Sequence, residues 1–203
     1  MVEITQNNHL GNYEMPDNCD KQVLVDVGAN NGNFTMSQVK NFKLIHFYEP
    51  YKPCFDTVTS MVENMENVIG FNEAVYSESN RIVRLIAHKN LDSGSNAIKT
   101  ELLNDEWEHE LHDVNTISLE DVLNRVGGKI NYLKIDCETS EYLFLMDKNL
   151  ENIDYIGIEL HWQMGEFNFN RLINHIKKTH DCNSDCNWIQ NSNKEVLFKN
   201  KKI

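Results

Sequence analysis

The segment from Val23 to Gly32, read as V-L-V-D-V-G-A-N-N-G, constrains the fold more than any other part of the chain. Its first half is a short run rich in valine, which predicts a buried β-strand. Gly28 and Gly32 follow directly, and glycine lets a backbone turn tightly and approach a ligand closely. A strand, a glycine loop and then a helix are typical of the ligand-binding edge of an α/β sheet.

Four more short apolar runs predict further strands of the same sheet, at residues 44–48, 68–72, 132–135 and 155–160. Between and after them, apolar residues recur at three- and four-residue steps, which predicts amphipathic helices. The helical positions are Phe55, Val58, Val62 and Met65, and later Phe169, Leu172, Ile173 and Ile176. Ser118 and Asp121 fit a capping box that opens a short helix over 119–126, which Gly127 and Gly128 end. The alternation predicts a mostly parallel sheet with helices on both faces.

Three segments depart from this alternation. Residues 1–20 are polar and are expected to be a lead-in that folds over a site, and residues 77–113 are expected to be an insertion. Residues 187–190 and 195–199 flank an Asn-Ser-Asn turn and predict a C-terminal antiparallel hairpin. At 203 residues the chain is long enough for one core, so 21–203 is expected to be a single domain.

The spacing of the glycine loop favours a ligand without phosphate. A dinucleotide pyrophosphate is usually held by G-x-G-x-x-G, whereas this loop reads G-x-x-x-G. An adenosyl sulfonium suits it, with Asp26 near the cationic end, Glu49 on the ribose about 20 residues downstream, and Asn72 to Ala74 near the adenine. The expected cofactor contacts are Asp26, Gly28, Ala29, Asn30, Gly32, Glu49, Asn72, Ala74 and Asp136.

Acidic residues follow the predicted fourth and fifth strands and should meet at the same edge. The candidate catalytic residues are Asp136, Glu138, Glu141 and His161, with Glu159 beside them. Either His161 or Asp136 would be the base, or the carboxylates would bind Mg²⁺ or Ca²⁺ to orient a diol. The alternative is that the glutamates only begin a helix and His161 only ends a strand.

Other polar clusters give weaker signals. Residues 108–113 have the wrong spacing for an H-E-x-x-H zinc helix and are expected to form a solvated acidic helix. His180, Cys182 and Cys186 lack a convincing fourth zinc ligand, so no metal is assigned. Residues 92–96 are a polar turn that either lines an acceptor pocket or is a surface loop.

These motifs together resemble the FkbM-type methyltransferases, whose pattern is D-x-G-A-N-x-G, E-P, N-x-A, T-L-D-D and K-I-D-x-E-G-x-E. The matching stretches here are 26–32, 49–50, 72–74, 117–121 and 134–141. The resemblance implies a Rossmann-like class I methyltransferase fold, S-adenosylmethionine as cofactor, and O-methylation of a small hydroxylated, carbohydrate-like acceptor. It departs at Thr139, where the family has glycine. A β-branched residue at positive φ would strain or reshape that turn.

Composition limits the partners. With 19 basic and 31 acidic residues the formal charge is −12, which disfavours nucleic acid and anionic membranes as partners. No apolar run is long enough to span a bilayer and the N-terminus lacks a signal pattern, so a cytoplasmic location is expected. The odd set of five cysteines suggests no disulfides. Two alternatives remain: a non-catalytic cofactor-binding module, and a nicotinamide-dependent oxidoreductase, which the loop spacing disfavours.

Overall fold

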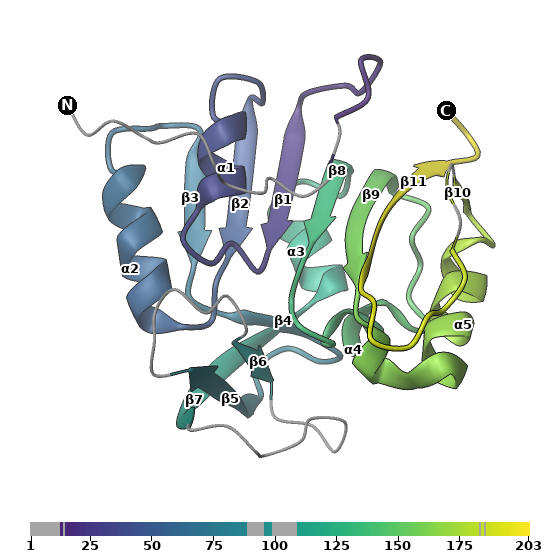
Figure 1. Cartoon of the computed structure of the whole chain (residues 1–203). Helices are drawn as coiled ribbons and strands as arrows, with labels where there is room; N and C mark the ends of the chain where they lie inside the picture. Colours follow the sequence, from purple (N-terminus) through teal and green to yellow (C-terminus); the bar gives the residue numbers. More distant parts are fainter. Residues whose placement is uncertain (1–12, 14, 89–95, 99–108, 183, 185) are drawn as a thin grey trace.

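A seven-stranded, mostly parallel sheet forms the centre of the computed structural model, which describes residues 13, 15–88, 96–98, 109–182, 184 and 186–203 (Figure 1). The strands stand in the order β10-β11-β9-β8-β1-β2-β3. Their bounds are Val23–Val27 (β1), Leu44–Tyr48 (β2), Val68–Phe71 (β3), Ile130–Ile135 (β8), Ile153–Leu160 (β9), His180–Cys182 (β10) and Lys194–Asn200 (β11). From β1 the chain runs outward to β2 and β3, and it later returns to add β8 and β9 on the other side. Such a reversal point opens a crevice at the carboxyl ends of the strands.

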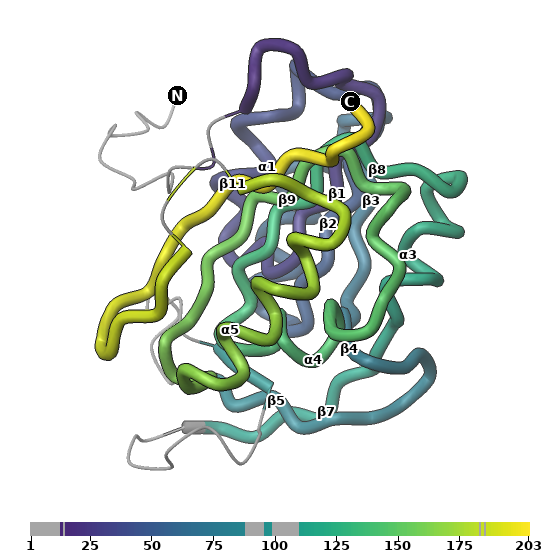
Figure 2. The backbone as a smooth tube through the Cα atoms, turned by 90° about the vertical axis from the view of Figure 1, so that its right-hand side faces the viewer, coloured from purple at the N-terminus to yellow at the C-terminus, as the bar shows by residue number. Residues whose placement is uncertain are grey.

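Helices cover both faces of this sheet, as the alternation predicts. Their bounds are Asn33–Gln38 (α1), Lys52–Met61 (α2), Leu119–Arg125 (α3), Glu141–Leu145 (α4), Trp162–Met164 (the 3₁₀ helix η1) and Gly165–Ile176 (α5). Because side chains alternate along a strand, Leu24 packs with α1 and α2, whereas Val25 and Val27 pack with α3, α4 and α5. The side view shows α1 and α3 on opposite sides of the strands (Figure 2).

Local signals define several of these helix ends. The Ser118 side chain accepts a hydrogen bond from the Asp121 backbone N–H at 3.2 Å, so the predicted cap opens α3. Gly127 and Gly128 end that segment with φ of 86° and 91°. The helix α2 ends at Met61, so of its predicted positions Val62 is the C-cap and Met65 lies beyond it. All four predicted apolar positions of α5 are buried.

A second, four-stranded sheet lies beneath the carboxyl ends of the main strands (Figure 1). It has the order β4-β7-β5-β6, with bounds Ala74–Tyr76 (β4), Ile82–His88 (β5), Ala97–Ile98 (β6) and His109–Ser118 (β7). The expected acidic helix at 108–113 is therefore wrong from residue 109 onward. This segment pairs antiparallel with β5, and its buried Val114 and Thr116 alternate with exposed residues. Residues 89–95 and 99–108 of the predicted insertion lie outside the described residues.

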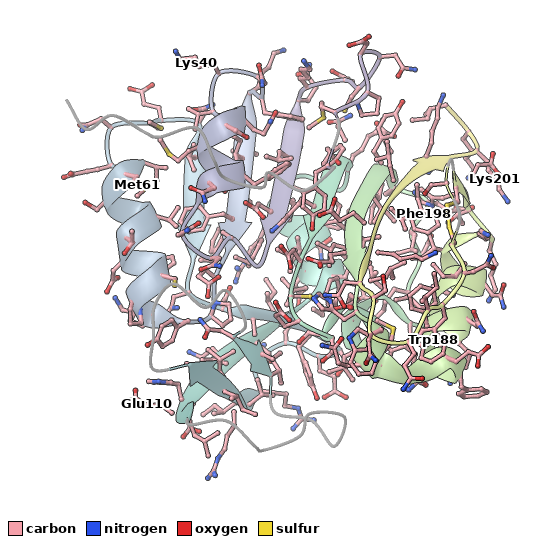
Figure 3. All side chains as sticks on the ribbon, in the orientation of Figure 1. Lys40, Met61, Glu110, Trp188, Phe198 and Lys201 are labelled. Atoms are coloured by element: carbon pink, nitrogen blue, oxygen red, sulfur yellow. A yellow bond between two sulfur atoms is a disulfide. The ribbon has the colours of Figure 1, made fainter. Side chains whose placement is uncertain are left out.

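The C-terminal hairpin forms with a different partner from the predicted one. β11 pairs antiparallel with β9 and with β10, whereas residues 187–190 contribute one isolated bridge, from Ile189 to Ser192. Phe198 of β11 is fully buried on the sheet, and Trp188 packs at the edge of the same core (Figure 3). The polar sequence of β10 gives no apolar alternation from which to predict it.

The cysteine prediction is also corrected. Cys182 and Cys186 form a disulfide, whereas no disulfide was expected. His180 is buried and its Nε2 lies 3.0 Å from the Ile153 carbonyl oxygen, so these three residues do not present a zinc site. In the part of the chain that is described, we find no helix with both the length and the apolar character needed to cross a bilayer.

Candidate active site

A pocket opens where the carboxyl ends of β1, β2 and β8 face the second sheet. The loops after β1, β2, β3 and β8 and the strands β4, β5 and β6 form its walls. Its lining residues are Val27, Gly28, Asn30, Tyr48, Glu49, Pro50, Glu73, Ala74, Val75, Leu85, Asn96, Ile98, Asp136, Cys137, Glu138 and Ser140. The pocket therefore lies in the crevice that the strand order predicts.

Gly28 brings two of these loops into direct contact. It has φ of +75°, and a β-carbon at this position would lie 1.8 Å from the Asp136 carbonyl oxygen. The Gly28 and Ala29 N–H groups both donate to the Tyr48 carbonyl oxygen, at 3.0 and 3.2 Å. The glycine thus closes the loop after β1 against both neighbouring strands, and these two N–H groups already have partners.

Asp26 lies under the loop and not in the pocket. It is fully buried, accepts a hydrogen bond from the Thr35 hydroxyl at 2.7 Å, and lies 3.2 Å from Lys134 Nζ. Lys134 also donates to the Gly28 carbonyl oxygen at 2.8 Å. The expectation that Asp26 contacts the cationic end of a cofactor is therefore corrected: with Lys134 it supports the loop from below.

Glu49 presents a buried carboxylate to the pocket. Its two oxygens accept hydrogen bonds from the Asn30 and Tyr51 N–H groups, at 2.7 and 2.8 Å. Burial raises the pKa of Glu49 to about 7, and the two N–H groups and the Lys134 charge oppose that rise. A carboxylate has about four acceptor positions, so roughly two remain for the hydroxyls of a ligand. Asn72 supports this strand end, since its side chain donates to the carbonyl oxygens of Glu49 and Pro50 at 2.9 Å.

The turn between β8 and α4 adopts a strained backbone. Glu138 and Thr139 have φ of 51° and 78°, in the left-handed region that disfavours a β-branched residue. Thr139 is buried, and its hydroxyl makes no hydrogen bond to any residue that the structure describes. Glycine, which the similar family has at the position of Thr139, would adopt this conformation without strain.

His161 is buried between two glutamates. Its Nδ1 lies 3.0 Å from Glu141 Oε1, and its Nε2 lies 3.3 Å from Glu138 Oε2. Burial alone would lower the pKa of His161. The Glu141 and Glu138 carboxylates have the larger, opposite effect, so the pKa is raised to about 11. An imidazole that already holds its proton is a poor proton acceptor, so this geometry disfavours His161 as the base.

Two further carboxylates meet at the ends of β8 and β9. Ligand atoms of Asp136, Glu159 and His161 lie within 4.8 Å of one another. Burial, followed by the Asp136 charge, raises the pKa of Glu159 to about 7. Tyr13, which sequence reasoning did not select, lies nearby: burial and the same two carboxylates raise its pKa, and Lys134 Nζ lies 5.7 Å from its ring centroid.

The structure brings about half of the predicted site residues to the pocket. Those that line it are Gly28, Asn30, Glu49, Ala74, Asp136 and Glu138. Those that lie outside its lining are Asp26, Ala29, Gly32, Asn72, Glu141 and His161. Of the predicted polar turn at 92–96, Asn96 lines the pocket and residues 92–95 lie outside the described residues. Lys134 was missed, although a lysine inside an apolar strand was a visible signal.

Comparison with known proteins identifies the fold and the domain type. A family model described as "Methyltransferase FkbM domain" matches residues 26–186. No curated protein matches the sequence. An rRNA methylase from Streptococcus thermophilus matches with a TM-score of 0.51 at 11% identity, over 89% of this chain and 87% of that one. A Streptococcus mutans protein, named as a methyltransferase candidate and solved with SAH, matches with a TM-score of 0.50 at 11% identity, over 88% of each chain. These likenesses confirm the Rossmann-like class I methyltransferase fold.

Proposed function

The chain belongs to the FkbM methyltransferase domain family, and from this premise we propose that it transfers a methyl group from S-adenosylmethionine to a hydroxyl group of a small polyhydroxy acceptor. The cofactor would occupy the pocket at the ends of β1, β2 and β8. The acceptor would approach beside Asp136 and Glu138, on the wall that the turn after β8 provides.

The observation that carries this proposal is the geometry of Glu49. Its carboxylate is buried and fixed by two backbone N–H groups, yet it keeps acceptor positions toward the pocket. A ribose diol offers two hydroxyl donors in a matching arrangement, and an acid at this strand end is the usual ribose partner in such folds. Beyond Glu49, the apolar side chains of Ala74, Leu85 and Ile98 offer a surface for the adenine.

The chemistry required of the protein is modest. S-adenosylmethionine supplies an electrophilic methyl group on a sulfonium. The protein gains rate mainly by holding the acceptor oxygen in line with that group. The hydroxyl proton must pass to a nearby acceptor, and Asp136 and Glu138 are the carboxylates on that wall of the pocket.

The charge of the chain favours a small acceptor over RNA. The formal charge is −12, and Asp136 and Glu138 add carboxylates to the pocket itself, whereas the Glu73 carboxylate is paired with Arg125. A phosphate backbone would be repelled by this potential, whereas neutral hydroxyls would find hydrogen-bond acceptors. The rRNA methylase shares the fold, and a shared fold does not transfer a substrate.

A transfer assay tests the proposal. Purified protein is incubated with S-adenosylmethionine carrying a labelled methyl group, together with mono- and oligosaccharides, other polyols, or RNA. Label should move to a polyhydroxy compound, and Glu49→Ala should abolish the transfer. Glu63 is exposed, so Glu63→Ala should leave the transfer unchanged. Transfer to RNA alone would refute the acceptor class, and cofactor binding without transfer to any acceptor would favour a non-catalytic module.

A further inference from the structure

The ends of β8 and β9 carry a group of side chains that lies beside the cofactor pocket. Ile135 pairs with Ile158 in the parallel register, so the next residues, Asp136 and Glu159, stand opposite each other. His161 follows Glu159 by two positions, and residues two apart point to the same face of an extended chain. The register therefore brings Asp136, Glu159 and His161 together, with ligand atoms within 4.8 Å of one another.

The two ring nitrogens of His161 have the contacts that are usual for a metal-binding histidine. Its side chain is buried, and Nδ1 lies 3.0 Å from the buried Glu141 carboxylate, which fixes the ring. Its other nitrogen, Nε2, is buried and has no hydrogen-bond partner among the described residues. It lies 3.3 Å from Glu138 Oε2, an ion-pair contact without hydrogen-bond geometry. Histidine ligands commonly donate one ring N–H to a carboxylate and bind metal through the other nitrogen.

The local charge also favours a cation. Asp26 is matched by Lys134. A neutral His161, which metal ligation requires, matches the charge of neither Glu138 nor Glu141, so these two carboxylates add to those of Asp136 and Glu159 at this corner. Lys134 lies 3.7 Å from Asp136, farther than its 3.2 Å contact with Asp26. Converging carboxylates with one imidazole are ligands that divalent metals accept.

We propose that Asp136, Glu159 and His161 bind a divalent cation, of which Mn²⁺ is the test ion, and that Glu141 is the positioning residue for His161. A ligating imidazole must be neutral, so binding displaces a proton from His161 Nε2 to solvent. The remaining coordination positions would face the pocket wall formed by Asp136 and Glu138. There they could bind two neighbouring oxygens of a polyhydroxy acceptor.

The competing explanation is that His161 is a permanent cation held by Glu138 and Glu141 for structural reasons alone. In that case Glu159 would have no ligand role, and Mn²⁺ would find no defined site. The binding measurement therefore uses the metal alone, without cofactor or acceptor, so its outcome does not depend on the proposed methyl transfer.

The test is a titration of the metal-free full chain with MnCl₂, followed by the electron paramagnetic resonance signal of free Mn²⁺. We expect one bound ion per chain. Glu159→Gln should weaken binding at least tenfold, and Glu141→Gln roughly 10- to 100-fold through loss of the ring orientation. Circular dichroism and the thermal midpoint establish that each variant is folded, and Asp136→Asn replaces Glu159→Gln if the latter does not fold.

Glu195→Gln is the matched control. Glu195 stands opposite Glu159 in the register of β11 and β9, so the substitution removes the same charge nearby without removing one of the proposed ligands. It should change Mn²⁺ binding less than threefold. Absence of a defined Mn²⁺ site in the wild-type chain would overturn the proposal, as would equal weakening by Glu195→Gln and Glu159→Gln.

Discussion

Replacement of Thr139 by glycine should stabilise the protein, although it removes a buried side chain. Thr139 has φ of 78°, it is buried, and its hydroxyl has no hydrogen-bond partner in the described part of the chain. Release from the left-handed conformation is worth about 1–2 kcal/mol. Removal of an unpaired buried hydroxyl is worth about 1–3 kcal/mol.

Two opposing effects reduce this gain. Glycine has more freedom in the unfolded chain, which costs about 0.5–1 kcal/mol. The lost β-carbon and methyl group together cost about 1.5 kcal/mol of apolar burial. The net expectation is a free energy of unfolding higher by about 1 kcal/mol, which corresponds to a thermal midpoint higher by about 2–4 °C for a chain of this length.

Urea unfolding of four chains separates these effects. Wild type, Thr139→Ser, Thr139→Ala and Thr139→Gly are compared by circular dichroism. Alanine removes the hydroxyl and retains the β-carbon, so it should fall between wild type and glycine, whereas serine retains the hydroxyl. If Thr139→Gly is less stable than wild type by more than about 1 kcal/mol, strain at this turn is not the dominant effect.

Three further substitutions test the glycine loop, the Glu49 carboxylate proposed to bind the ribose, and the buried ion pair between Lys134 and Asp26. Gly28→Ala should unfold the chain or abolish cofactor binding, because its β-carbon would lie 1.8 Å from the Asp136 carbonyl oxygen; normal stability and binding in calorimetry would contradict this. The folded-state pKa of Glu49 is raised from 4.5 to about 7 by burial, so the free energy of unfolding should fall as the pH rises through that range, by up to about 3 kcal/mol relative to Glu49→Gln. Parallel urea-unfolding curves of the two chains against pH would disprove that shift. Lys134→Met should cost about 3–5 kcal/mol by leaving Asp26 buried without its cation, and the double variant with Asp26→Asn should recover part of that loss in the same unfolding assay.

The parts of the fold that follow from local pattern could be predicted from the sequence. β1 and β2 have the predicted bounds because their runs are apolar, short and bounded by turn residues. The cap at Ser118 is a local hydrogen bond, so it too could be predicted. β10 could not, because its polar sequence is stabilised by pairing with β11 and by burial of His180. β7 resembled an acidic helix because its stabilising partner, β5, is distant in the sequence.

The candidate site also contains some residues that could be predicted from the sequence and others that could not. Gly28 and Glu49 follow strands directly, and their place at the pocket could be predicted from order along the chain. Asp26 also follows the pattern, but alternation along β1 directs its side chain into the core, where Lys134 meets it. Leu85 and Ile98 reach the pocket from the second sheet, whose position depends on tertiary packing and not on a motif.

Calorimetric titration with S-adenosylhomocysteine tests the central claim, that the pocket at the ends of β1, β2 and β8 holds the cofactor through Glu49. Wild type should bind one molecule per chain, and folded Glu49→Ala should bind at least tenfold more weakly, about 1.4 kcal/mol. Failure of the wild type to bind, or equal affinity of the two chains, would contradict the claim.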